Sequence, residues 1–148
     1  ATAAAIAMAV IARRPAPSPA PLRASLLAPQ GVTFDLLAGP AALSPDGSRI
    51  AFAGRNAQGR TSLYVRSLDS DAARIFPETE TVSFPFWSPD GQLIGYSTGN
   101  SVSFVPAAGG VPEKIVDLIR AGKASWSVSG DILVERAARA PSAGNPCP

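Results

Sequence analysis

The side chains in this sequence that could carry out chemistry are mainly carboxylates in short polar loops. Asp46 and Asp90 each stand third in the tetrapeptide Ser-Pro-Asp-Gly, and Glu78 and Glu80 are separated by one residue. Such carboxylates can bind calcium or act as general acids and bases. A calcium loop needs alternating acidic residues, however, and each aspartate is alone in its turn. The pattern therefore favours turn formation for the aspartates and solvated side chains for the glutamates.

Nucleophile and metal chemistry has little support in the composition. The sequence contains no histidine, which excludes Ser-His-Asp and Cys-His catalysis and imidazole metal ligands within this chain. The single cysteine, Cys147, has no partner for a disulfide or a zinc site, and we interpret it as incidental. Gly109 and Gly110 could suggest a phosphate loop, but no helical pattern follows them, so we expect a turn. We therefore predict no catalytic, cofactor-binding or metal-binding residue.

The overall composition is that of a folded chain without a strongly charged partner. About half of the residues are hydrophobic (46%), 16% are charged, and the formal net charge is +2. This composition excludes a disordered acidic chain. The cations are scattered along the sequence, whereas a nucleic-acid-binding protein would cluster them on one face. We expect no nucleic-acid partner.

Residues 1–33 have the composition of a membrane anchor followed by a stalk. Residues 1–12 are uncharged and apolar and end at Arg13-Arg14. A membrane-spanning helix needs about 20 such residues, so we interpret 1–12 as the end of a transmembrane helix. An alanine-rich soluble helix and a clipped signal sequence are the alternatives. Prolines at alternate positions favour an extended spacer, and 13–33 is therefore predicted to be a Pro-rich juxtamembrane linker.

The region from 34 to 134 is dominated by short runs rich in β-branched and aromatic residues, separated by turn residues. After Val134 this pattern stops, and 135–148 is expected to be an irregular tail. The predicted strands are Arg49–Ala53, Ser62–Leu68, Ala73–Pro77, Val82–Ser88, Leu93–Ser97, Ser101–Pro106, Glu113–Leu118, Ala124–Ser127 and Asp131–Val134.

A repeat organises these strands. Ser88 follows Ser44 by 44 residues, and Ser127 follows Ser88 by 39. Four short strands per unit of about 40–45 residues are typical of a β-propeller blade. The sequence therefore predicts an all-β fold, a partial β-propeller of about two to three four-stranded blades.

The Ser-Pro-Asp-Gly corners are predicted to be hairpin turns. Proline favours the first central position of a type I turn, and glycine takes the left-handed position that follows aspartate, which gives a hairpin with a G1 bulge. The hydroxyls of Ser44 and Ser88 can bond the backbone of the turn. Trp87, just before the second corner, is expected to pack between neighbouring blades.

These strings resemble a known family of repeats. "ALSPDGSRIAFAG" (42–54), "LYVRSLDS" (63–70) and the segment from Phe76 to Ile115 are similar to TolB-like, WD40-like (PD40) propeller repeats. They are most similar to the propeller that follows the membrane helix in bacterial transmembrane serine/threonine kinases. No kinase motif occurs in this chain, so no catalytic residue is implied.

The resemblance implies a non-catalytic sensing or protein-interaction module. It would be anchored in a bacterial membrane through the N-terminal helix, with the propeller in the periplasm. Its ligand would be a protein or a small molecule of unknown identity, and no cofactor is implied. Two alternatives remain open: a TolB-like periplasmic scaffold, and the N-terminal propeller of a prolyl-oligopeptidase-like serine peptidase.

Overall fold

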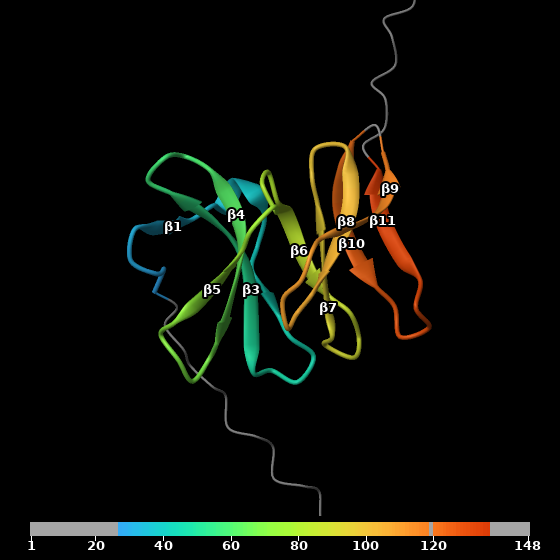
Figure 1. Cartoon of the computed structure of the whole chain (residues 1–148). Helices are drawn as coiled ribbons and strands as arrows, with labels where there is room; N and C mark the ends of the chain where they lie inside the picture. The colour runs from blue at the N-terminus through green and yellow to red at the C-terminus, as the bar shows by residue number, and fades with distance from the viewer. Residues whose placement is uncertain (1–26, 119, 137–148) are drawn as a thin grey trace, which may run out of the picture.

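The computed structural model of the protein describes residues 27–118 and 120–136. These residues form three antiparallel β-sheets and one short 3-10 helix, η1 (Leu36–Ala38) (Figure 1). The predicted all-β fold is confirmed. The segments expected to form the membrane helix (1–12) and most of the linker and tail lie outside the described residues.

The first sheet is a blade whose innermost strand is divided in two. Both β1 (Val32–Phe34) and β2 (Ala42–Leu43) pair with β3 (Arg49–Asn56), β1 near its end and β2 near its start. The sheet continues through β4 (Thr61–Ser67) to β5 (Ala73–Phe76). The sequence did not predict η1, which separates β1 from β2.

The second sheet is a complete four-stranded meander in the order β6-β7-β8-β9. Its strands are β6 (Ser83–Trp87), β7 (Leu93–Ser97), β8 (Ser101–Pro106) and β9 (Glu113–Asp117). These bounds agree with the predicted strands to within one residue at each end.

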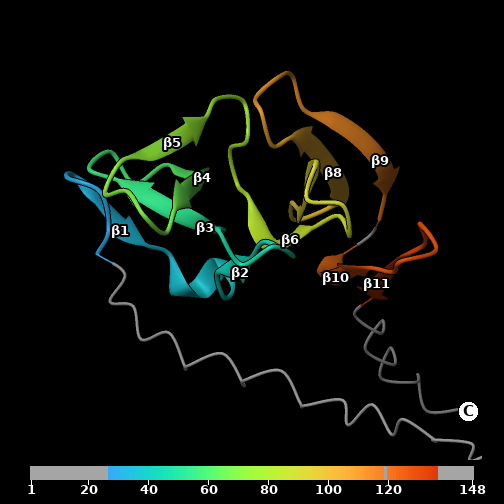
Figure 2. The same cartoon turned by 90° about the horizontal axis from the view of Figure 1, so that it is seen from below.

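The third sheet is a single hairpin, β10 (Ala121–Trp126) with β11 (Ile132–Arg136). Viewed from below, β2, β6 and β10 lie along one side of the three sheets, while β5 and β9 lie on the other (Figure 2). β6 contacts both β2 and β10. This is the radial arrangement of propeller blades, with two complete blades and the first half of a third.

Two sheet ends differ from the predicted propeller region 34–134. β1 begins at Val32 because its first residue pairs with Asn56. β11 continues to Arg136, which lies opposite Ala121 across a bulge. Pairing with a neighbouring strand therefore extends the start of β1 and the end of β11 beyond the region of β-rich sequence. Such pairing cannot be recognised in a single sequence.

The main hydrophobic core lies between the first and second sheets. It takes alternate residues of β3, β4 and β7, as expected where one face of each strand points into a core, and single residues of β5, β6 and β8. Complete burial of a large apolar side chain contributes about 1.5–3 kcal/mol. The buried members are Ala51, Ala53, Leu63, Val65, Phe76, Val82, Trp87, Ile94, Tyr96 and Val105.

The third hairpin is covered on one face only. Gly122, Ala124, Trp126, Ile132 and Val134 are half-buried, and Trp126 packs against Phe86 of β6, with ring centroids 6.2 Å apart. The alternating residues Lys123, Ser125, Leu133 and Glu135 are exposed, and Leu133 keeps 76% of its surface. In a propeller each blade is covered by its neighbours, so this face is where a further blade would pack.

Candidate functional site

The first Ser-Pro-Asp-Gly corner is the predicted hairpin turn. Gly47 has φ +71° and donates its N–H to the Ser44 carbonyl at 2.8 Å. The Ser44 hydroxyl donates to Asp46 Oδ1 at 2.5 Å and accepts the Arg49 N–H at 2.9 Å. The serine therefore ties the turn to the start of β3, as its hydroxyl chemistry predicted.

The second corner repeats this geometry and the third modifies it. Gly91 has φ +68°, and the Ser88 hydroxyl donates to Asp90 at 2.6 Å. In the third corner Ser127 accepts the Asp131 N–H at 3.1 Å, one residue earlier than in the other two. Gly130 keeps the left-handed conformation, with φ +95°. A shorter loop therefore forms a similar corner, with Val128 and Ser129 in place of the proline and aspartate of Ser-Pro-Asp-Gly.

The two corner aspartates are held as carboxylates. The hydroxyls of Ser44 and then Ser48 lower the pKa of Asp46 below its usual value. Ser88, followed by the Gln92 N–H, lowers the pKa of Asp90 in the same way. A general acid or base that operates near neutral pH needs a pKa near that pH. These bonds favour a structural role for both side chains.

The glutamates lie on the connection between the first two sheets. Glu78 and Glu80 are exposed, and Glu80 pairs with Arg60. Thr79 between them is buried, where its hydroxyl donates to the Phe76 carbonyl at 2.6 Å and accepts the Leu63 N–H at 2.9 Å. Glu78 and Glu80 therefore flank a buried threonine that fixes this connection to the first sheet.

The two other candidates from the sequence were the Gly109-Gly110 pair and Cys147. Gly109 has φ +101° in the turn after β8, and the Arg74 guanidinium fills the space beside it, donating to the Ala108 carbonyl at 2.5 Å. β9 follows this turn, as expected for a hairpin and not for a phosphate loop. Cys147 lies outside the described residues.

Trp87 connects the first two blades, as predicted. It is 7% exposed, and its Nε1–H donates to the Ala42 carbonyl at 2.9 Å. The Arg49 guanidinium lies 4.8 Å from the centre of the indole ring and donates to the Gly91 carbonyl at 3.0 Å. These contacts fix the first corner against the second.

The structure reveals a polar site that the sequence did not: a buried carboxylate, Asp35, at the opposite end of β3. Asp35 follows β1 and is 8% exposed. It accepts hydrogen bonds from Arg55 Nη2 at 2.7 Å, Arg55 Nε at 3.2 Å and the Thr61 hydroxyl at 2.8 Å. The Arg55 hydrogen bonds and then Thr61 lower the pKa of Asp35. The pair is therefore an ionised, fixed unit.

This pair forms one wall of a cleft of about 250 Å³ where the first two blades meet. Leu37 lines the cleft and is 91% exposed, and its neighbour Leu36 is 82% exposed. Thr81 on the opposite wall has φ +63°, a strained conformation of the kind that gathers at functional sites. The lining residues are Asp35, Leu37, Ala38, Arg55, Thr61, Thr81, Val82 and Ser83.

The cleft has the chemistry of a recognition surface. The Arg55 side chain keeps 49% of its surface although Asp35 holds its orientation. A preorientated guanidinium beside exposed leucines can contact a polypeptide through hydrogen bonds and apolar surface together. No sequence pattern predicts this site, because Asp35 and Arg55 are twenty residues apart in the chain and neither belongs to a recognisable motif.

Acid should weaken the fold through these carboxylates. Asp35, Asp46 and Asp90 all have folded-state pKa values below their ordinary value, so their stabilisation is complete above about pH 4 and is lost as pH falls through the folded-state pKa values. We expect Asp35→Asn to lower the free energy of unfolding by about 1 kcal/mol at pH 7 and by less at pH 3. Urea titrations at both pH values measure this difference.

The matched control is Asp69→Asn on the exposed loop after β4, which we expect to change the unfolding free energy by less than about 0.5 kcal/mol. Equal effects of the two substitutions at pH 7, or a loss from Asp35→Asn that does not shrink in acid, would contradict the structural role of Asp35.

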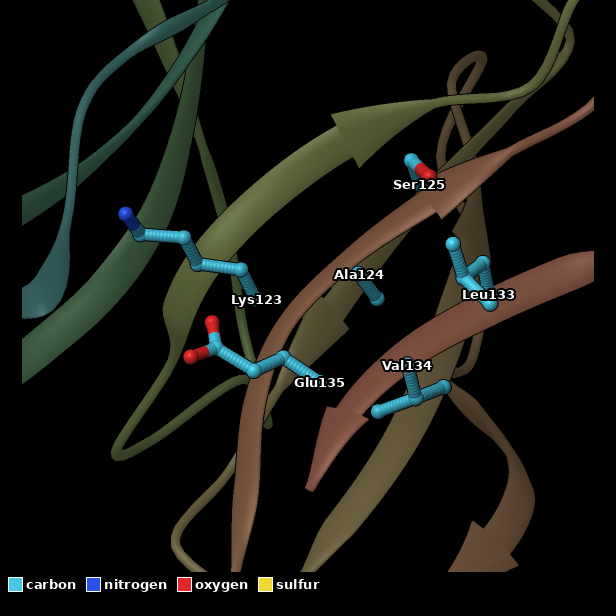
Figure 3. Close-up of a pocket in the computed structure, with 6 residues that line it drawn as sticks. All are labelled: Lys123, Ala124, Ser125, Leu133, Val134 and Glu135. Atoms are coloured by element: carbon cyan, nitrogen blue, oxygen red, sulfur yellow. The ribbon is translucent and has the colours of Figure 1, made fainter. Parts of the chain in front are cut away.

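A hollow of about 360 Å³ lies on the third hairpin. Figure 3 shows its six lining residues, with Lys123 and Glu135 projecting from neighbouring strands on the same side. Lys123, Ser125, Leu133 and Glu135 belong to the exposed face of this hairpin. The hollow is therefore part of the surface on which a further blade would pack.

Within 27–118 and 120–136, no cluster of three potential metal-ligating side chains occurs, and no helix has the length and apolarity to cross a membrane.

Comparisons with known proteins identify the fold. No family model and no curated protein matches the sequence. Among solved structures, a protein assigned as TolB from Agrobacterium tumefaciens matches with a TM-score of 0.57 and 24% identity, over 65% of this chain and 38% of that one. TolB from Acinetobacter baumannii matches with a TM-score of 0.55 and 17% identity, over 76% of this chain and 28% of that one.

A third structure, the β-propeller domain of the Trilobed protease from Pyrococcus furiosus, matches with a TM-score of 0.53 and 17% identity, over 65% of this chain and 33% of that one. The chain thus spans about a third of the length of the propeller structures that it resembles. Together with the two blades and the half blade described above, these matches show that the chain has the fold of part of a β-propeller, like that of the TolB structures.

Proposed function

We propose that the chain is a non-catalytic, protein-binding part of a β-propeller. The observation that carries this proposal is the cleft beside Asp35, where a half-exposed guanidinium held by a buried carboxylate lies next to two exposed leucines. Arginine is enriched among the anchor residues of protein interfaces, and exposed apolar groups supply contact area. The corner carboxylates are engaged in their own turns and support the fold.

The parent protein that we propose first is a membrane-anchored bacterial serine/threonine kinase, with this propeller as its periplasmic sensing region. The order of apolar segment (1–12), Pro-rich segment (13–33) and propeller supports this proposal, as do the longer sequence strings. The ligand would be a protein or a small molecule, and the scattered cations argue against nucleic acid.

The second candidate is a TolB-like periplasmic scaffold that binds other envelope proteins, which the similarity to two TolB structures favours. The third is the propeller of a serine peptidase, for which the Pyrococcus furiosus domain is the support. The flanking coding sequence separates them. Kinase H-R-D and D-F-G motifs upstream select the first, a signal peptide the second, and a downstream G-x-S-x-G hydrolase the third.

Site-specific crosslinking tests the binding role. A photo-crosslinking amino acid at Leu37, introduced into the full encoded protein in its own host cell, is expected to give a discrete crosslinked product. The same amino acid at Val111, which is 76% exposed on the loop before β9, is the matched control and is expected to give none. Identical patterns at the two positions, or none at Leu37, would refute the assignment of the cleft as the binding surface.

A further inference from the structure

The two blade junctions at the corner face are built from equivalent positions. Arg49 is the first residue of β3, and Leu93 is the first residue of β7; each follows its serine by five residues. Each faces the tryptophan that ends the inner strand of the next blade, Trp87 or Trp126. The first junction therefore serves as a template for the second.

At the first junction, arginine fills the space between the corners. The Arg49 guanidinium stacks on Trp87 at 4.8 Å and donates from Nη2 to the Gly91 carbonyl at 3.0 Å. The apolar ring and the carbonyl of the neighbouring corner thus bind one cationic side chain. This combination of ring face and acceptor suits a planar guanidinium.

At the second junction, leucine replaces arginine and the space is open. A cavity of about 240 Å³ lies there. Trp126 is half-buried and Val128 is 95% exposed, so the cavity is accessible from solvent. Its lining residues are Ser88, Pro89, Asp90, Leu93, Trp126, Val128 and Gly130.

The acceptors of this cavity suit a cation. The Gly130 carbonyl accepts Trp126 Nε1–H at 3.2 Å, and a carbonyl oxygen has a second lone pair. Asp90 supplies the charge: its Oδ1 accepts the Ser88 hydroxyl and the Gln92 N–H, and Oδ2 takes part in none of the hydrogen bonds of the described residues. The lining set contains an acidic side chain and no basic one.

We propose that this cavity binds the guanidinium group of an arginine side chain from a partner polypeptide, which takes the place that Arg49 occupies at the first junction. The guanidinium stacks on Trp126, while Asp90 and the Gly130 carbonyl accept its hydrogen bonds. This site is separate from the cleft beside Asp35, and its existence does not depend on the role proposed for that cleft.

The test is an NMR titration of the 148-residue chain with Nα-acetyl-arginine-methylamide. The indole N–H signal of Trp126 and the amide signal of Gly130 are expected to shift, with a dissociation constant on the order of millimolar, as for one solvent-accessible cation–π contact with hydrogen bonds. The lysine analogue is expected to bind at least about fivefold more weakly, and the neutral citrulline analogue more weakly still. Equal binding of the citrulline analogue would overturn the proposal.

Two variants and a control locate the site. Leu93→Arg supplies the guanidinium from within the chain and is expected to abolish binding and raise the melting temperature. Asp90→Asn preserves the shape of the turn and is expected to weaken binding at least about threefold. Leu133→Arg makes the same substitution at an exposed position outside the cavity and is expected to leave the titration unchanged.

Unchanged binding in both Leu93→Arg and Asp90→Asn would refute the site. Agmatine, a free guanidinium compound without a peptide backbone, distinguishes the source of the ligand. Binding of agmatine without binding of the capped arginine would overturn the assignment to a polypeptide, and comparable binding of the two supports it.

Discussion

Replacing Trp87 with alanine is expected to lower the free energy of unfolding by about 3–5 kcal/mol. The substitution removes a buried ring from the core between the two complete blades, leaves the Ala42 carbonyl without its indole donor, and removes the surface on which Arg49 stacks. Urea unfolding followed by circular dichroism measures the loss.

Trp126→Ala is the matched control, because Trp126 ends the equivalent strand of the third blade. Its ring is half-buried and bonds its own corner at Gly130, so we expect a loss of only about 1 kcal/mol. Equal losses from the two alanine substitutions would mean that the core is not centred on the junction between the first and second blades.

Gly95→Ala is expected to cost about 2–3 kcal/mol, unusually much for the addition of one methyl group. Gly95 lies opposite Phe86 on β6, and a Cβ at this position would overlap the Phe86 ring. Gly95 belongs to β7, which pairs with β6 on one side and β8 on the other, so its backbone cannot move without disturbing both ladders. Thermal and urea unfolding of the variant measure this cost.

Two further variants test the cause. Gly99→Ala introduces the same methyl group on the β7–β8 loop, where nothing lies within 4 Å, and is expected to change stability by less than about 0.5 kcal/mol. Phe86→Leu combined with Gly95→Ala is expected to destabilise less than the sum of the two single substitutions, because the smaller side chain relieves the overlap. Strict additivity would contradict the packing seen at this pair.

Local chemistry made most of the strands and all three corners predictable. The Ser-Pro-Asp-Gly turns specify their own backbone, and Gly47 and Gly91 adopt the left-handed conformation that the turn type requires. Trp87 could be placed between blades because a large ring before a repeated corner needs a neighbouring surface. Local sequence patterns also predicted β7 and β8, and the predicted bounds of both strands agree with the structure at both ends.

The site beside Asp35 depended on contacts that the sequence does not reveal. Asp35 meets Arg55 and Thr61 only because β1 pairs with the far end of β3, and three residues are too few to show a strand pattern. The sequence does not predict η1 either, which divides the inner strand and carries two exposed leucines, Leu36 and Leu37. Long-range pairing decided both features.

The unequal burial of the three sheets has a physical consequence. A propeller blade gains stability from the sheets on either side, and the core here joins only the first two. Among residues 27–118 and 120–136, β11 pairs with β10 alone and one face of the third hairpin is exposed, so within this part of the chain the hairpin depends on one neighbouring sheet. We therefore expect the stability of the described residues to be graded from the first junction to the third blade.

Amide hydrogen exchange of the purified chain tests the central claim, that the chain is a propeller segment with one shared core between two complete blades. We predict that the amides of β3, β4, β7 and β8 exchange most slowly and share one opening free energy, and that those of β10 and β11 exchange at least about 100-fold faster. Independent opening of the first and second sheets, or protection of β10 and β11 equal to that of β3 and β7, would contradict the account.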